Sequence, residues 1–201
     1  MILKPNYYRA TNAAYEIISR MHALKFPMNV LNIAKQYPKL RAASYSDMAR
    51  RFNMSFGEFY HFASSGHGYL QRDSKDLAKA YIVYNDYKDE TTIRFTQAHE
   101  LAHYVLGHTE DNDLFNKEAN CFARNLLCPI PVVNELGIQT INDYMYVFGI
   151  SEPMAKVCVN FKEADYYHIT HKNYVPVSDL AVSYITGYSV PALYGYTCLA
   201  I

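Results

Sequence analysis

Two histidines and a glutamate have a spacing that suits metal-assisted hydrolysis. The pentapeptide from His99 to His103 reads His-Glu-Leu-Ala-His. On a helix, positions i and i+4 lie one turn apart on the same face, so both rings can bind one metal ion. Zinc lowers the pKa of a bound water to about 7, and a neighbouring carboxylate can then take its proton. The motif therefore predicts zinc ligands at His99 and His103 and a general base at Glu100.

The low number of matches expected by chance and the predicted local structure both favour a functional interpretation of this motif. The chain has 8 histidines among its 201 residues, and at this composition the pattern is expected about 0.01 times. The alternative is a helix with two partly exposed histidines and no metal. A strand is expected at residues 79–84, rich in β-branched and aromatic side chains and followed by a turn. A helix is then expected from about residue 92 to 106, with Gly107 as its C-terminal stop.

A second helix is expected at residues 114–127, where Pro129 and Pro131 end it. Ala119 and Ala123 are small residues on one face, which would let this helix approach the first one closely. In gluzincin-type enzymes a glutamate on such a second helix provides the third metal ligand, so this segment is where we expect that ligand.

Most of the remaining chain has helical periodicity. Ser55 and Glu58 form a capping-box pattern at the start of a short helix. Ser46 is expected to cap the short helix that precedes this one in the sequence. The further expected helices cover residues 7–25, 30–37, 46–52, 55–63, 140–148 and 151–161. From about Ile169 onwards no clean period is visible, and we expect an extended tail or paired strands there.

Composition narrows the function further. Lys plus Arg and Asp plus Glu both number 19, so the chain lacks the basic surplus typical of nucleic-acid binders. No apolar run approaches the roughly 18 residues of a membrane span, and no secretory signal is visible, which predicts a cytoplasmic protein without membrane contact. The four cysteines form no metal-binding or disulfide pattern, and we expect them to be reduced and mostly buried: Cys121, Cys128, Cys158 and Cys198.

Three segments resemble the ImmA/IrrE family of metallo-endopeptidases. They are residues 94–108 around the histidine motif, residues 118–129 with the sequence Glu-Ala-Asn-Cys-Phe-Ala-Arg-Asn-Leu-Leu-Cys-Pro, and residues 148–155 with Phe-Gly-Ile-Ser. The resemblance covers about residues 10–165. It implies an α+β fold, namely a mostly helical zincin-like domain with a short sheet packed beside the motif helix. We expect this metallopeptidase domain to span residues 1–168, followed by a C-terminal tail, 169–201, of unassigned role.

The resemblance also implies a function. Members of this family carry out regulated proteolysis in the cytoplasm and often cleave helix-turn-helix repressors of phages and mobile elements. The expected cofactor is therefore Zn²⁺, and the expected partner is a protein substrate such as a repressor, with no direct binding of nucleic acid.

The third zinc ligand departs from the family pattern. That pattern places a glutamate three residues before the alanine of the Ala119–Asn120 pair, and this chain has Asn116 there. Three alternatives follow. Asn116 binds weakly through its amide oxygen, Glu118 serves after a small shift of the helix start, or two histidines and waters hold the metal. The last would give a weak or inactive enzyme that acts as a binding or sensor module.

Two further residues near the motif have expected roles. Asn120 is a candidate to orient a zinc-binding histidine through a hydrogen bond, and the alternative is a helix-surface amide. His108 follows Gly107, and we expect it to be a loop residue near the site and not a ligand.

Overall fold

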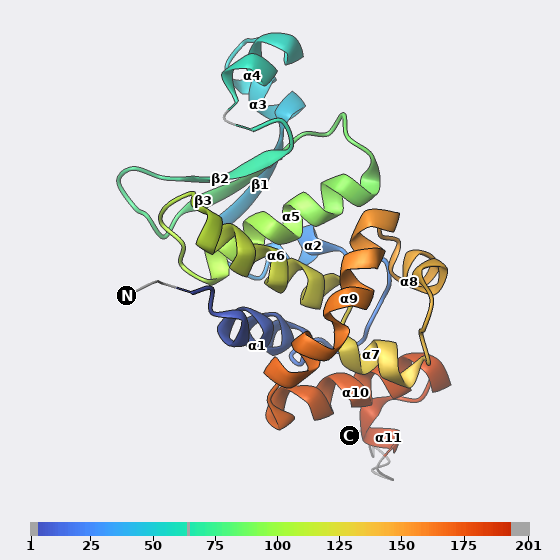
Figure 1. Cartoon of the computed structure of the whole chain (residues 1–201). Helices are drawn as coiled ribbons and strands as arrows, with labels where there is room; N and C mark the ends of the chain where they lie inside the picture. The colour runs from blue at the N-terminus through green and yellow to red at the C-terminus, as the bar shows by residue number, and fades with distance from the viewer. Residues whose placement is uncertain (1–3, 64, 194–201) are drawn as a thin grey trace, which may run out of the picture. The chain divides into compact units, whose positions relative to one another are not determined.

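The computed structural model describes residues 4–63 and 65–193 (Figure 1). These residues are mostly helical and include a three-stranded sheet, which confirms the expected α+β class. They divide into two compact units. The first comprises the residues up to Asn6 together with Asn29–Ala123, and the second comprises Tyr7–Met28 with the residues from Arg124 onwards. The histidine motif lies in the first unit.

The first unit combines the sheet with short helices and the helix that carries the motif. Its elements are α2 (Val30–Ala34), β1 (Leu40–Ser44), α3 (Tyr45–Arg51), α4 (Phe56–Phe62), β2 (Gly68–Arg72), β3 (Ala80–Tyr84), α5 (Glu90–Val105) and the larger part of α6 (Asp113–Leu127).

Strand β3 is the centre of the sheet, whose order is β1-β3-β2. It pairs in parallel with β1 and antiparallel with β2. Ile82 and Val83 are fully buried, as a central strand requires, and the strand expected at residues 79–84 is confirmed. The sequence does not indicate β1 or β2. Both are short segments with little β-branched character, and pairing with β3 determines their conformation.

Helix α5 packs against β2 and β3, and Figure 1 shows it alongside the sheet. It begins after Asp89, whose Oδ1 accepts a hydrogen bond from the Thr92 backbone at 2.9 Å. It ends before Gly107, which has a φ of +69° and acts as the expected C-terminal stop. The predicted helix at residues 92–106 is thus confirmed, as is the helix predicted at 114–127.

The two short helices α3 and α4 both begin with a capping box. In α4 the box is formed by Ser55 and Glu58, as the sequence predicts. In α3 the cap is Ser44 and not Ser46, because Asp47 lies three residues after Ser44 and completes the reciprocal pair of hydrogen bonds.

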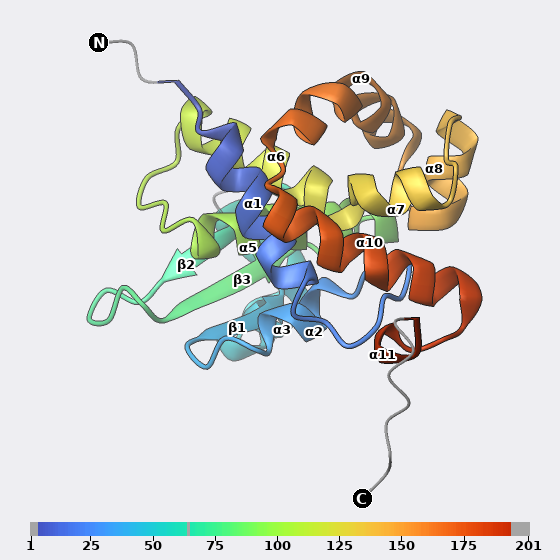
Figure 2. The ribbon, with the colours of Figure 1, turned by 90° about the horizontal axis from the view of Figure 1, so that it is seen from below.

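The second unit is helical. It contains α1 (Tyr7–Ile18), the end of α6, α7 (Ile130–Glu135), α8 (Ile141–Phe148), α9 (Glu152–His168), α10 (His171–Thr186) and α11 (Val190–Leu193). Helices α1 and α10 lie side by side (Figure 2). Asn12 links them, because its Oδ1 accepts hydrogen bonds from the Thr170 backbone at 3.1 Å and from Asn173 Nδ2 at 2.9 Å. Among the described helices, none has both the length and the apolar character needed to cross a membrane.

The expectation of an extended or stranded tail is wrong for residues 171–186, which form α10. Its buried residues do recur at helical spacing, at Asn173, Val177, Leu180 and Ala181. The pattern is hidden in the sequence because one buried position is an asparagine and because Pro176 lies within the helix. Cys198, expected to be reduced, lies outside the described residues, and the other three cysteines are buried free thiols, as expected.

Gly68 allows β2 to approach both β3 and α5. A Cβ atom at this position would lie 2.6 Å from the Val83 carbonyl oxygen and 2.6 Å from Thr96 Cγ2. We expect Gly68→Ala to lower the free energy of unfolding by about 1–3 kcal/mol, because the backbone must shift to relieve the overlap. Urea denaturation measures this change. The matched control is Gly57→Ala in α4, where a Cβ meets nothing within 4 Å. Equal losses in both variants, or none at Gly68, would contradict the interpretation.

Candidate metal centre

The rings of His99 and His103 face each other on α5, and their Nε2 atoms are 3.0 Å apart. The second nitrogen of each ring has its own partner. His99 Nδ1 lies 2.9 Å from Asn120 Oδ1, and His103 Nδ1 lies 3.0 Å from His108 Nδ1. Because an amide oxygen only accepts, His99 Nδ1 donates and its Nε2 keeps a lone pair. Asn120, the residue expected to orient a histidine, thus holds the His99 ring.

Both histidines of the motif favour the neutral state. The pKa of His103 is lowered to about 3, chiefly by burial and in addition by the neighbouring rings of His99 and His108. Burial also lowers the pKa of His99. At neutral pH each imidazole therefore carries only one ring proton. This neutral state is the one that metal binding requires.

Glu100 is buried next to the histidine pair, with 8% of its surface exposed. The pKa of its carboxyl group is raised to about 8, chiefly by burial and also by the negative charge of Asp111, while a hydrogen bond from the Leu70 backbone acts in the opposite direction. A cation close by would oppose the first two effects and favour the ionised form. The carboxyl group is therefore poised to exchange a proton near neutral pH.

The two candidate third ligands on α6 have different surroundings. The Asn116 side chain lies close to both His99 and His103, and its polar group raises the pKa of each ring. Glu118 is buried, and both of its oxygens are used elsewhere. Its Oε1 accepts from the Asn6 backbone at 2.7 Å, and its Oε2 is 3.0 Å from His108 Nε2. The structure therefore brings Asn116, and not Glu118, to the histidine pair.

Three further residues contact the groups around the pair. Arg72 of β2 donates through Nη2 to the backbone carbonyls of His103 and His108, at 3.2 and 3.0 Å, and so fixes the C-terminal end of α5 to the sheet. Asp111 accepts a hydrogen bond from Asn116 Nδ2 at 2.8 Å. His108 lies in the loop after α5, as expected, and is almost fully buried there. Contacts of this kind join distant segments, and no local pattern marks Arg72.

The donor set suits a divalent ion that accepts nitrogen and oxygen ligands. Two neutral imidazole nitrogens face each other, with an amide next to them and a buried carboxyl group one residue away, and zinc accepts this chemistry. Across the part of the chain that the structure describes, no three His, Cys, Asp or Glu side chains form a metal site. The third side chain beside the histidine pair is the amide of Asn116, which is not one of these four residue types.

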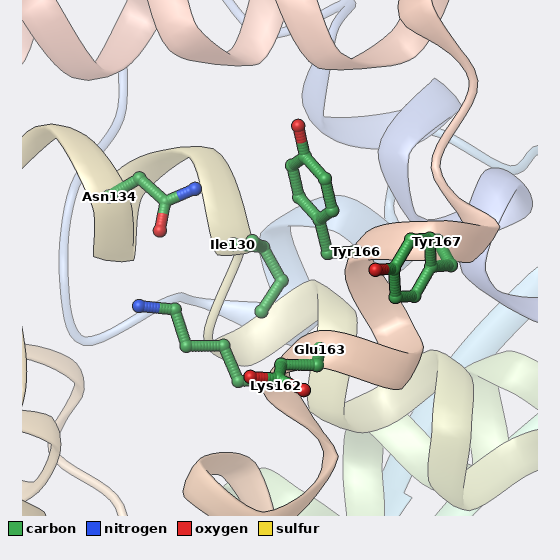
Figure 3. A pocket seen from close by; sticks show the side chains of 6 residues that line it. All are labelled: Ile130, Asn134, Lys162, Glu163, Tyr166 and Tyr167. Atoms are coloured by element: carbon green, nitrogen blue, oxygen red, sulfur yellow. The ribbon is translucent and has the colours of Figure 1, made fainter.

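A separate hollow of about 330 Å³ lies in the second unit (Figure 3). Side chains of α7 and α9 line it: Ile130, Asn134, Lys162, Glu163, Tyr166 and Tyr167. It has none of the residues of the histidine motif, and its one carboxylate and one ammonium group do not form a hydrolytic arrangement.

Comparison with known families agrees with this geometry. The model of the IrrE N-terminal-like domain, a family of M78 peptidases, matches residues 56–157, about half of the chain. The match includes all of α5 and α6 and every residue of the candidate metal centre. No curated protein and no solved structure matches the chain at a significant level. The family implies a metal cofactor and protein substrates. The chain belongs to the IrrE N-terminal-like domain family of metallopeptidases.

Proposed function

We propose that this protein is a zinc-dependent endopeptidase in which His99, His103 and Asn116 hold the ion. The observation that carries the proposal is the pair of Nε2 atoms 3.0 Å apart. Two lone pairs at this distance repel each other, unless a proton or a cation lies between them. A zinc ion there would lower the pKa of a bound water and polarise the scissile carbonyl.

Asn116 is the proposed third ligand because its amide has a fixed direction. Its Nδ2 donates to Asp111, so its Oδ1 is the atom available to the histidine pair. An amide oxygen is a neutral ligand and weaker than a carboxylate. The charge of Asp111 compensates in part, since it favours positive charge on both His99 and His103. Glu118, the other candidate from the sequence, directs one oxygen to the Asn6 backbone and the other to His108.

Glu100 is the proposed general base. Its carboxylate takes a proton from the attacking water and passes it to the leaving amine, a transfer that suits a group whose pKa lies near the working pH. Burial keeps water from competing for this proton. The Leu70 backbone, on the outer strand β2, donates to the same carboxyl group. An outer strand can pair with an extended peptide, which would bring a scissile bond close to Glu100.

The proposed substrate is a helix-turn-helix repressor of a phage or mobile element, cleaved in the cytoplasm. This part rests on the resemblance to ImmA/IrrE proteins. The buried free thiols of Cys121, Cys128 and Cys158 agree with a reducing compartment. The equal numbers of basic and acidic residues agree with a protein partner in place of direct nucleic-acid binding.

One observation favours a second candidate function. The family pattern has a glutamate where this chain has Asn116, and a neutral ligand gives weaker zinc binding. On this alternative the fold binds a regulatory protein and acts as a sensor or docking module with little or no hydrolysis. Binding of a repressor without cleavage, by the zinc-loaded chain, would distinguish it from the endopeptidase.

The role of Asn116 can be tested by changing its ligand strength. We expect Asn116→Ala to weaken zinc binding by about tenfold or more, and Asn116→Glu to strengthen it, because a carboxylate would replace the amide oxygen. Competition with a chromophoric chelator measures the zinc Kd. The control is Lys117→Ala, the exposed next residue of α6. Unchanged affinity in both Asn116 variants would show that the third ligand lies elsewhere.

The role of Glu100 can be tested by removing its ability to accept a proton. Glu100→Gln should retain about one zinc per chain while cleavage of a repressor or of labelled casein falls by about 10²–10⁴-fold. The matched control is Glu90→Gln, an exposed glutamate in the first turn of the same helix, which should cleave at the wild-type rate. A Glu100→Gln protein that cleaves as fast as the wild type would exclude Glu100 as the base.

A further inference from the structure

We propose that Glu118 and His108 are positioning residues that hold His103 in the tautomer needed for metal binding. The three residues form a buried chain of hydrogen bonds, here termed the Glu118 relay. His103 Nδ1 lies 3.0 Å from His108 Nδ1, and His108 Nε2 lies 3.0 Å from Glu118 Oε2. The inference rests on the proposed function, because it assigns a purpose to the orientation of one proposed ligand.

The carboxylate of Glu118 fixes one end of the relay. A carboxylate only accepts hydrogen bonds, so His108 Nε2 carries a proton and donates it to Glu118. When a metal ion binds His103 through Nε2, the atom that faces His99, the ring proton of His103 lies on Nδ1. His103 Nδ1 then donates to His108 Nδ1, which needs a neutral His108 ring with its own proton on Nε2. In this metal-binding state each donor of the relay meets one acceptor, and the relay favours the form of His103 that can bind a metal.

The relay is held rigidly from several sides. Glu118 cannot rotate freely, because its Oε1 accepts from the Asn6 backbone at 2.7 Å. The His108 ring stacks on Phe115 with ring centres 4.3 Å apart and planes 12° from parallel, and the His108 carbonyl accepts from Arg72. His108 and Glu118 are each only 4% exposed. Hydrogen bonds shielded from water in this way are strong and fix orientation.

A simpler role would be to join the start of α6 to the end of α5 without any effect on the metal. Glu118→Gln distinguishes the two roles, since glutamine keeps the volume but has only one accepting oxygen. If its amide nitrogen faces His108, the relay reverses, and His103 then carries its proton on Nε2. If its oxygen faces His108, the Asn6 backbone loses its acceptor.

The experiment combines zinc affinity with histidine tautomers. In the purified chain we expect Glu118→Gln to weaken the zinc Kd by about 10–100-fold while circular dichroism stays unchanged. The matched control is Glu110→Gln, an exposed glutamate in the loop between α5 and α6, which should bind zinc like the wild type. Unchanged zinc affinity in a folded Glu118→Gln protein would overturn the proposal.

The tautomer of His108 provides the second readout and requires no variant. Nitrogen-15 spectra of histidine side chains in the metal-free wild-type chain should show the proton of His108 on Nε2. A proton on Nδ1 in place of Nε2 would overturn the relay, whether or not Glu118→Gln folds. Since this spectrum is taken without zinc, it decides the relay even if the chain proves not to bind zinc, which would be a failure of the proposed function alone.

Discussion

The facing Nε2 atoms of His99 and His103 are the constraint on which the site depends. Two imidazoles one turn apart on α5 meet at 3.0 Å only if both rings are turned by partners on their other nitrogen. Asn120 turns the first ring and His108 the second. The geometry of the pair is thus determined by α6 and by the turn between the two helices, and α5 alone would leave both rings free to rotate.

Burying such polar groups is costly unless each has a hydrogen-bonding partner. In the first unit, strand β2, helix α6 and the loop between α5 and α6 provide these hydrogen-bonding partners. The Leu70 backbone donates to Glu100, and Arg72 of the same strand donates to the carbonyls at the end of the helix. The close approach of β2, which the absence of a side chain at Gly68 permits, therefore supports the candidate site as well as the fold.

The sequence predicts the parts of this arrangement that depend on local pattern. The motif helix, the helix after it and the central strand β3 follow from periodicity, caps and β-branched content. The strands β1 and β2 do not, since their conformation comes from pairing with β3. Helix α10 is hidden by the buried polar Asn173. At the site, Arg72 and Leu70 act from a strand about 30 residues before the motif, and His108 has an ordinary loop sequence. The proposal of Asn116 in place of Glu118 as a ligand rests on the direction of each side chain, which the sequence does not give.

Zinc content tests the central claim, that the pair on α5 holds a metal. The purified chain should contain about one zinc per molecule by elemental analysis, and a His99→Ala variant with the same circular dichroism should contain almost none. Zinc absent from the wild-type chain even after a modest excess is added, or equal amounts in both proteins, would contradict the account.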